Sequence, residues 1–200
     1  FYNMLISDNV TKMKKPLNQN QVKAIRKMTP DNPLHNLLIN LSTDLMLRAS
    51  DLLKLKVSDV MFENGKVRET VRVKQKKTKN YTIDIPLSDH SKKAIVKFLT
   101  DKNADDFIFV GQKSHYTRKA ITTVQYQRII KQWMRMLGVD DVSSYSTHSM
   151  RKTLASHIYS KTNNVEAVRR LLGHQSVTAT SSYLNVSNDD ATALAVQHHI

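Results

Sequence analysis

The sequence predicts a mainly α-helical α+β domain with a small antiparallel β-hairpin on one edge. A series of leucines recurs at the spacing of a single buried helix face: Leu34, Leu37, Leu38, Leu41 and Leu45. Met150, Leu154 and Ile158 fall four residues apart and predict a second helix that buries one face. Apolar and charged residues alternate over residues 67–73 and again over 81–85, which is typical of two paired strands.

The N-terminal part is predicted to consist of an arm followed by two helices. Residues 1–15 end in a lysine-rich run and are expected to form a linker or entry arm. Asn18 and Gln21 have capping-box spacing at the start of a helix predicted over residues 18–28. After a proline-containing turn, the leucine-rich helix leads directly to Arg48.

The loop of the hairpin is rich in lysine. It contains Lys74, Lys76, Lys77 and Lys79. Asn80 follows them and is expected to take the left-handed conformation of the turn. Beyond the hairpin, the pattern predicts a helix over residues 88–99 and a short strand over 107–110.

The segment from Gly111 to Gly138 is strongly basic and contains no acidic residue. Its latter part has helical spacing, with expected core positions at Val124, Ile129, Ile130, Trp133 and Met136. Tyr126 and Trp133 are expected to be core aromatics rather than platforms for bases. A basic helix of this kind favours contact with a DNA backbone. With two hairpin lysines, the candidate DNA contacts are Lys76, Lys79, Lys113, Arg118, Lys119, Arg128 and Lys131.

Charge also indicates nucleic acid as a partner. Of the 200 residues, 31 are Lys or Arg and 17 are Asp or Glu, which gives a formal net charge of +14. The chain has no cysteine, which excludes disulfides and thiolate metal sites and agrees with a reducing cytoplasm. No apolar run approaches the ~20 residues of a membrane span. We therefore expect a cytoplasmic, DNA-associated protein with no membrane partner.

The C-terminal third places several chemically active residues at defined spacings. His148 and Arg151 are three residues apart, so on a helix they share a face and can converge on one ligand. Gly173 stands where a left-handed helix cap belongs, so His174 is expected on a bend between two helices. The bend matters because His174 and Tyr183 are nine residues apart and would point in opposite directions on one continuous helix.

This ordered set resembles the C-terminal signature of the tyrosine recombinases, the family of phage integrases: His-x-x-Arg at 148–151, Leu-Leu-Gly-His at 171–174, and Tyr183. The segment around Arg48 is similar to the first arginine box of the family, and Asp51 stands at its acidic position. A carboxylate three residues away can hold a guanidinium in one orientation. The family usually has glycine two places before the arginine, where this chain has Met46. Lys77-Thr78 matches the catalytic lysine that the family carries on the hairpin.

The resemblance implies an integrase-type catalytic domain over residues 16–186, followed by a C-terminal tail helix over 187–200. The implied catalytic residues are Arg48, Lys77, His148, Arg151, His174 and Tyr183, with Asp51 in support. In the family the arginines clamp the scissile phosphate, the first histidine takes or relays the proton of the nucleophile, and the lysine protonates the departing 5′ oxygen. The second histidine donates to a non-bridging oxygen, and the tyrosine attacks to form a 3′-phosphotyrosine. Neither a metal nor another cofactor is implied, because the side-chain cations take the place of metals.

The implied partners are double-stranded DNA with a specific recombination site, further copies of the chain in a tetramer on that DNA, and an accessory DNA-bending protein. Two other functions stay open. One is a non-catalytic, architectural DNA-binding protein on the same fold, and the other is relaxation of DNA in the manner of type IB topoisomerases. The family usually carries a separate N-terminal domain that closes around DNA, which residues 1–15 are too few to supply.

Overall fold

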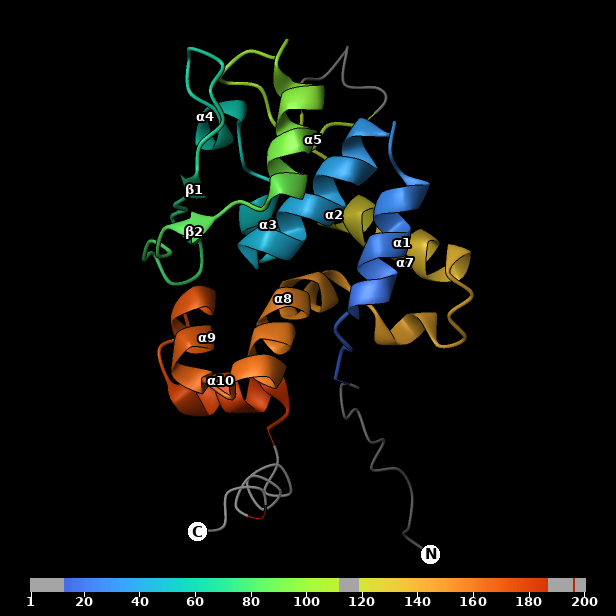
Figure 1. Cartoon of the computed structure of the whole chain (residues 1–200), viewed down its shortest axis with the longest axis vertical. Helices are drawn as coiled ribbons and strands as arrows, with labels where there is room; N and C mark the ends of the chain where they lie inside the picture. The colour runs from blue at the N-terminus through green and yellow to red at the C-terminus, as the bar shows by residue number, and fades with distance from the viewer. Residues whose placement is uncertain (1–12, 112–118, 187–195, 197–200) are drawn as a thin grey trace, which may run out of the picture.

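The computed structural model describes residues 13–111, 119–186 and 196, and it confirms the mainly helical α+β fold (Figure 1). The longer helices are α1 (Gln19–Met28), α2 (Pro33–Leu45), α5 (Asp89–Leu99), α7 (Thr123–Met136), α8 (Thr147–Thr162), α9 (Val165–Leu172) and α10 (Val177–Leu184). Short elements are α3 (Ala49–Leu52), α4 (Val57–Val60), the 3-10 turn η1 (Val142–Ser144), β1 (Thr70–Val71) and β2 (Ile85–Pro86). The predicted arm up to residue 12 and, Val196 apart, the predicted tail helix lie outside the described residues.

Helix α2 forms the centre of the fold. Residues 37–45 of this helix are all buried, and it packs against α1, α5 and α8. Figure 1 shows α2 between α5 on one side and α8 on the other. Each fully buried leucine of this helix contributes about 1.5–3 kcal/mol of hydrophobic stabilisation. The leucine spacing therefore predicted the main core helix correctly.

Helix α2 ends at Met46 in the left-handed backbone region, with φ +49° and ψ +31°. This is the position where the family usually has glycine, and the Met46 side chain is only 2% exposed. A non-glycine residue in this region costs about 1 kcal/mol. The buried side chain offsets that cost, so the chain keeps the backbone bend while filling the space beside it.

We expect Met46→Gly to be more stable than Met46→Ala, the reverse of the usual order in a helix. Loss of the buried side chain lowers the free energy of unfolding by about 2–5 kcal/mol in Met46→Ala. Met46→Gly loses the same contacts but relieves the left-handed backbone, which recovers about 1 kcal/mol. Urea unfolding of the two variants checks this order, and a less stable glycine variant would contradict it.

The hairpin is present, but its strands are shorter than predicted over 67–73 and 81–85. Thr70 pairs with Pro86 and Val71 with Ile85, whereas the next bridge joins Lys74 to Tyr81. The second strand thus has one more residue than the first between these pairings, which makes a bulge. The bulge interrupts the alternation: Ile85 is buried, while Ile83 and Tyr81 are exposed.

Two further expectations need correction. The predicted strand at 107–110 is represented only by isolated bridges, from Phe107 to Lys56 and from Val110 to Ala120. In α7, Val124 and Met136 are exposed at the two ends of the helix, where neighbouring elements no longer cover them. Trp133, Tyr126 and the two isoleucines are buried as expected.

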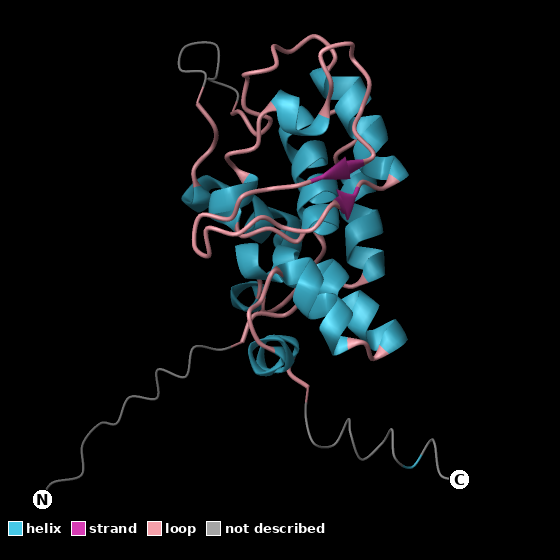
Figure 2. Cartoon of the chain, turned by 90° about the vertical axis from the view of Figure 1, so that its left-hand side faces the viewer, coloured by secondary structure: helices cyan, strands magenta, loops and turns pink. Residues whose placement is uncertain are grey.

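Helices α8, α9 and α10 follow one another closely and bring the C-terminal motif together. Helix α8 starts at a capping box formed by Ser146, and α9 ends at Gly173 with φ +65°. Helix α10 then begins at Ser176, whose side chain accepts from the Ala179 amide. Figure 2 shows the short strands with their long connecting loops on the face next to these helices. No helix among the described residues is long and apolar enough to span a bilayer.

Candidate active site

Arg151 is the most deeply buried of the six predicted catalytic residues. It lies in the second turn of α8 and is 3% exposed. Its Nη1 donates to the Met46 carbonyl at 2.9 Å, and its Nη2 donates to the Leu172 carbonyl at 2.7 Å. Because these carbonyls end α2 and α9, the negative ends of two helix dipoles meet the guanidinium. Burial lowers the pKa of Arg151 to about 10, so the group stays charged at neutral pH.

Arg48 is linked to Arg151 through the buried Gln75. Arg48 is the N-cap residue of α3, and its Nη1 donates to Gln75 Oε1 at 2.8 Å. Gln75 Nε2 donates in turn to the Leu172 carbonyl at 3.4 Å, the same oxygen that Arg151 binds. The charge of Arg48 is also close enough to lower the pKa of Arg151. The structure therefore brings the two predicted phosphate-binding arginines to one place.

Tyr183 lies beside this cluster, on α10. Its hydroxyl donates to the His148 carbonyl at 3.5 Å. Its ring meets the His174 ring edge to face, with 5.2 Å between the centroids. The Nζ atom of Lys152 lies 4.7 Å from the centroid of the Tyr183 ring, within the range of a cation–π contact. The predicted nucleophile is thus next to both predicted histidines of its own chain.

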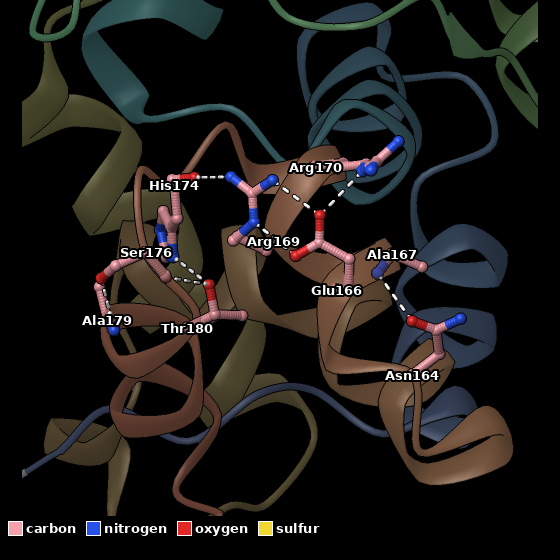
Figure 3. A network of polar contacts seen from close by, with 9 residues as sticks. All are labelled: Asn164, Glu166, Ala167, Arg169, Arg170, His174, Ser176, Ala179 and Thr180. Carbon is pink, nitrogen blue, oxygen red and sulfur yellow. Dashed lines mark hydrogen bonds and ion pairs between the residues drawn. The ribbon is translucent and has the colours of Figure 1, made fainter.

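A polar network holds the bend that carries His174 (Figure 3). Arg169 donates to the His174 carbonyl at 2.7 Å, and both oxygens of Glu166 accept from the same guanidinium at 2.6 and 2.7 Å. On the imidazole side, Nδ1 of His174 lies 3.1 Å from the hydroxyl of the fully buried Thr180. When this hydroxyl donates to Nδ1, the ring proton lies on Nε2 and can be donated to a ligand.

Burial and positive charge tune the titratable groups of the site. Burial raises the pKa of Tyr183 to about 12, although Arg151 and Arg48 act in the opposite direction. Burial, then the charges of Arg151 and Arg48, lower the pKa of His174 to about 4. The pKa of His148 is lowered as well, by partial loss of hydration and by the neighbouring cations. At neutral pH the site therefore combines charged arginines with neutral imidazoles and a protonated phenol.

The lowered pKa of His174 predicts a loss of stability in acid. The unfolded chain binds a proton on this ring near pH 6.5, whereas the folded protein does so only near pH 4. The stability from the neutral ring is fully present above pH 6.5 and is lost as the pH falls toward 4. We expect the wild type to lose about 1 kcal/mol more than His174→Gln between pH 7.5 and 5.0, after allowance for partial exposure. Urea unfolding at both pH values checks this, and equal losses in both proteins would contradict it.

Lys77 lies in the exposed loop of the hairpin, two residues after Gln75, and Lys76 and Lys79 are exposed too. The left-handed residue of this loop is Lys79, with φ +62°, and not Asn80 as expected. The loop closes earlier than predicted because the Lys79 amide donates to the Gln75 carbonyl. Position alone does not choose among the three lysines.

Asp51 contacts the hairpin instead of the arginine that its spacing suggested. The residue is 3% exposed, and its Oδ1 accepts from the Lys76 amide at 2.9 Å. Its Oδ2 is buried and has no hydrogen-bond partner among the described residues. Asp51 thus attaches the lysine loop to α3, and its charge raises the pKa of Arg151.

Of the predicted DNA contacts, Lys119 and Arg128 are exposed and Lys131 of α7 is half-buried. Lys113 and Arg118 lie outside the described residues. In the described part of the chain, no group of three or more histidine, cysteine, aspartate or glutamate side chains is placed to hold a metal ion.

Three residues of the site were not singled out from the sequence: Gln75, Lys152 and Thr180. Gln75 and Lys152 stand beside predicted residues, two positions before Lys77 and directly after Arg151. That proximity is a weak signal, because neighbours on a helix or strand usually point elsewhere. Their burial, at 2% and 6% exposure, became evident only in the folded chain.

Comparison with known proteins gives a family match over most of the chain. The model of the phage integrase family matches residues 15–189. The probable integrase/recombinase YoeC of Bacillus subtilis is 29% identical over 147 residues, which cover 74% of this chain and 75% of YoeC. The tyrosine recombinase XerA of Pyrococcus furiosus is 28% identical over 176 residues, which cover 86% of this chain and 58% of XerA.

Solved structures show the same fold. A crystal structure of XerA recombinase aligns with a TM-score of 0.73 at 19% identity, covering 94% of this chain and 66% of that one. The catalytic domain of bacteriophage HP1 integrase aligns with a TM-score of 0.58 at 18% identity, covering 93% and 95%. XerH bound to its difH substrate before cleavage aligns with a TM-score of 0.69 at 20% identity, covering 97% and 56%.

Proposed function

Because the chain belongs to the phage integrase family, we propose that it is a site-specific DNA recombinase that cuts and rejoins DNA through a covalent 3′-phosphotyrosine on Tyr183. Recombinases named among its relatives and DNA-bound recombinases among its structural neighbours support DNA as the substrate. The proposal covers strand exchange between specific sites by several copies of the chain.

The observation that carries this proposal is the convergence of Arg48 and Arg151 beside Tyr183. Two guanidinium groups can fork onto the oxygens of one phosphate and cannot lose their protons at neutral pH. They would stabilise the extra negative charge that develops when a fifth oxygen approaches phosphorus. The phenol next to them is the nucleophile, and it belongs to the same chain.

The proposed reaction has two mirrored steps. Tyr183 Oη forms a bond to phosphorus as the bond from phosphorus to the 5′ oxygen breaks. The phenol proton passes to His148, which can accept it because its lowered pKa keeps the imidazole neutral. Lys77 supplies a proton to the leaving 5′ oxygen, and His174 donates from Nε2 to a non-bridging oxygen. A 5′ hydroxyl of another strand then attacks the phosphotyrosine and restores the phenol.

A pool of nicked DNA duplexes with randomised sequence tests the proposal, because such a pool contains the target site whatever its sequence is. The nick lies a few base pairs downstream of each potential cleavage point, so the short 5′-hydroxyl fragment is lost and rejoining stops. We expect denaturation-stable protein–DNA adducts whose recovered sequences share one motif. The matched Tyr183→Phe protein should recover none.

The outcomes separate the alternatives. Adducts with no shared motif, together with relaxation of supercoiled plasmid, would instead support a topoisomerase-like activity. Salt-sensitive DNA binding without any adduct would support an architectural protein.

Lys77→Ala is expected to slow cleavage by about 10²-fold, the low end for loss of a general acid. Lys76→Ala and Lys79→Ala are the matched controls, because both lysines are exposed on the same loop. A substrate with sulfur in place of the 5′ bridging oxygen should restore the rate of Lys77→Ala, since a thiolate leaves without a proton. Equal slowing in all three variants, or no rescue by sulfur, would contradict the assignment of Lys77.

A further inference from the structure

We propose that Gln75 is a positioning residue that sets the separation of the two phosphate-binding arginines. This inference rests on the proposed function, because it concerns how the same site is held ready for phosphate. Gln75 is 2% exposed and lies in the hairpin loop, far along the chain from the helices that carry the other site residues.

A continuous chain of hydrogen bonds passes through this side chain. Arg48 donates to Gln75 Oε1, Gln75 Nε2 donates to the Leu172 carbonyl, and Arg151 donates to that same carbonyl. The two guanidinium groups are therefore connected by one amide and one carbonyl. The Thr78 hydroxyl also donates to Oε1, at 3.3 Å, which ties the loop that carries Lys77 to the same point.

The contact also explains a second feature of the Leu-Leu-Gly-His motif. A Cβ built on Gly173 would lie 2.6 Å from Gln75 Nε2, well inside contact distance. Gly173 therefore serves both its left-handed φ of +65° and the close approach of the Gln75 amide. The turn that precedes His174 and the loop that precedes Lys77 meet at this one side chain.

A primary amide is particularly suited to the position, because it must accept from a guanidinium and donate to a carbonyl at once. Glutamate can accept from Arg48, but it cannot donate to Leu172 when ionised, and its charge would compete with phosphate for the arginine. Methionine has a similar length and can do neither. These two replacements separate the hydrogen bonds from the packing.

We expect Gln75→Met to reduce the single-turnover cleavage rate about 10²-fold, the cost of a small misplacement of a catalytic group. DNA affinity should change by less than about threefold, since the guanidinium charges remain. Gln75→Glu should lose at least as much rate. Thr82→Val is the matched control: Thr82 is also buried in the hairpin, and its hydroxyl accepts from the Val73 amide, but it has no bond to an arginine. This control should cleave within about threefold of wild type.

Two measurements distinguish positioning from general destabilisation. In an Arg48→Ala background, Gln75→Met should cause no further loss of rate, because the residue acts through that arginine. In ¹⁵N-arginine NMR, the two Nη groups of Arg48 should give separate signals in the wild type and averaged signals in Gln75→Met. Multiplicative losses in the double variant, or unchanged Arg48 signals in Gln75→Met, would overturn the proposal.

The same experiments keep the two proposals apart. Absence of a wild-type adduct would contradict the proposed function, while the NMR comparison would still decide the role of Gln75. A normal wild-type adduct together with a normal rate in Gln75→Met would overturn only the positioning role.

Discussion

Replacement of Tyr183 by phenylalanine is expected to abolish covalent attachment to DNA and to leave DNA binding intact. The change removes the attacking oxygen but keeps the ring, with its contacts to His174 and Lys152. The lost hydrogen bond to the His148 carbonyl is long, at 3.5 Å, so the free energy of unfolding should fall by no more than about 0.5 kcal/mol. Denaturing electrophoresis on a nicked substrate and native binding assays measure the two effects separately.

Tyr159→Phe provides the matched control for this prediction. Tyr159 is another partly buried tyrosine of the C-terminal helices, and it is packed against the core on α8. This variant should form adducts at the wild-type rate. Adducts that persist in Tyr183→Phe, or that vanish in Tyr159→Phe, would assign the nucleophile elsewhere.

Loss of the Arg151 guanidinium should have the second-largest effect, and it should act on both activity and stability. Removal of a preorganised donor to transition-state charge costs about 10²–10³-fold in rate, so Arg151→Ala should cleave at least about 10³-fold more slowly. The same change leaves the Met46 and Leu172 carbonyls without their buried donor. Each unsatisfied carbonyl costs about 1–3 kcal/mol of stability.

Arg151→Lys separates charge from geometry, because it keeps a cation but cannot bind both carbonyls and a phosphate at once. We expect a defect of at least about 10²-fold in cleavage for this variant. Arg170→Ala is the control, since that arginine is largely exposed and pairs only with Glu166 on α9. Urea unfolding and single-turnover cleavage provide the two measurements. Cleavage by Arg151→Lys within tenfold of wild type would contradict the role of a forked guanidinium.

The helix ends and the main core could be predicted because their signals are local. Asn18 with Gln21 forms the capping box that its spacing suggested, and Gly173 takes the left-handed cap. The leucines of α2 are buried because the helical period already defined one face. Such features depend on residues within about one or two turns of one another.

Other features depend on contacts that no local pattern records. The bulge in the hairpin arises where the Thr82 hydroxyl, and not a backbone carbonyl, accepts from the Val73 amide. Asp51 binds the Lys76 amide because the fold brings the loop to it. Gln75 and Leu172 are 97 residues apart, so their contact follows only from the packing of the hairpin against α9.

Met46 illustrates a local rule that packing overrides. Glycine was the expected residue at this left-handed position, yet a methionine adopts the same backbone conformation and is buried. The bend, and with it the carbonyl that binds Arg151, is retained without the glycine. A departure from the family sequence therefore need not change the geometry of the site.

The decisive test of the proposed mechanism is to locate the phosphate in the covalent adduct. The adduct trapped on nicked DNA is digested with nuclease and protease, and the peptide that carries the nucleotide is sequenced by mass spectrometry. We expect a 3′-linked nucleotide on the phenolic oxygen of Tyr183. A nucleotide on any other side chain would contradict the mechanism, as would a linkage through the 5′ end of the DNA.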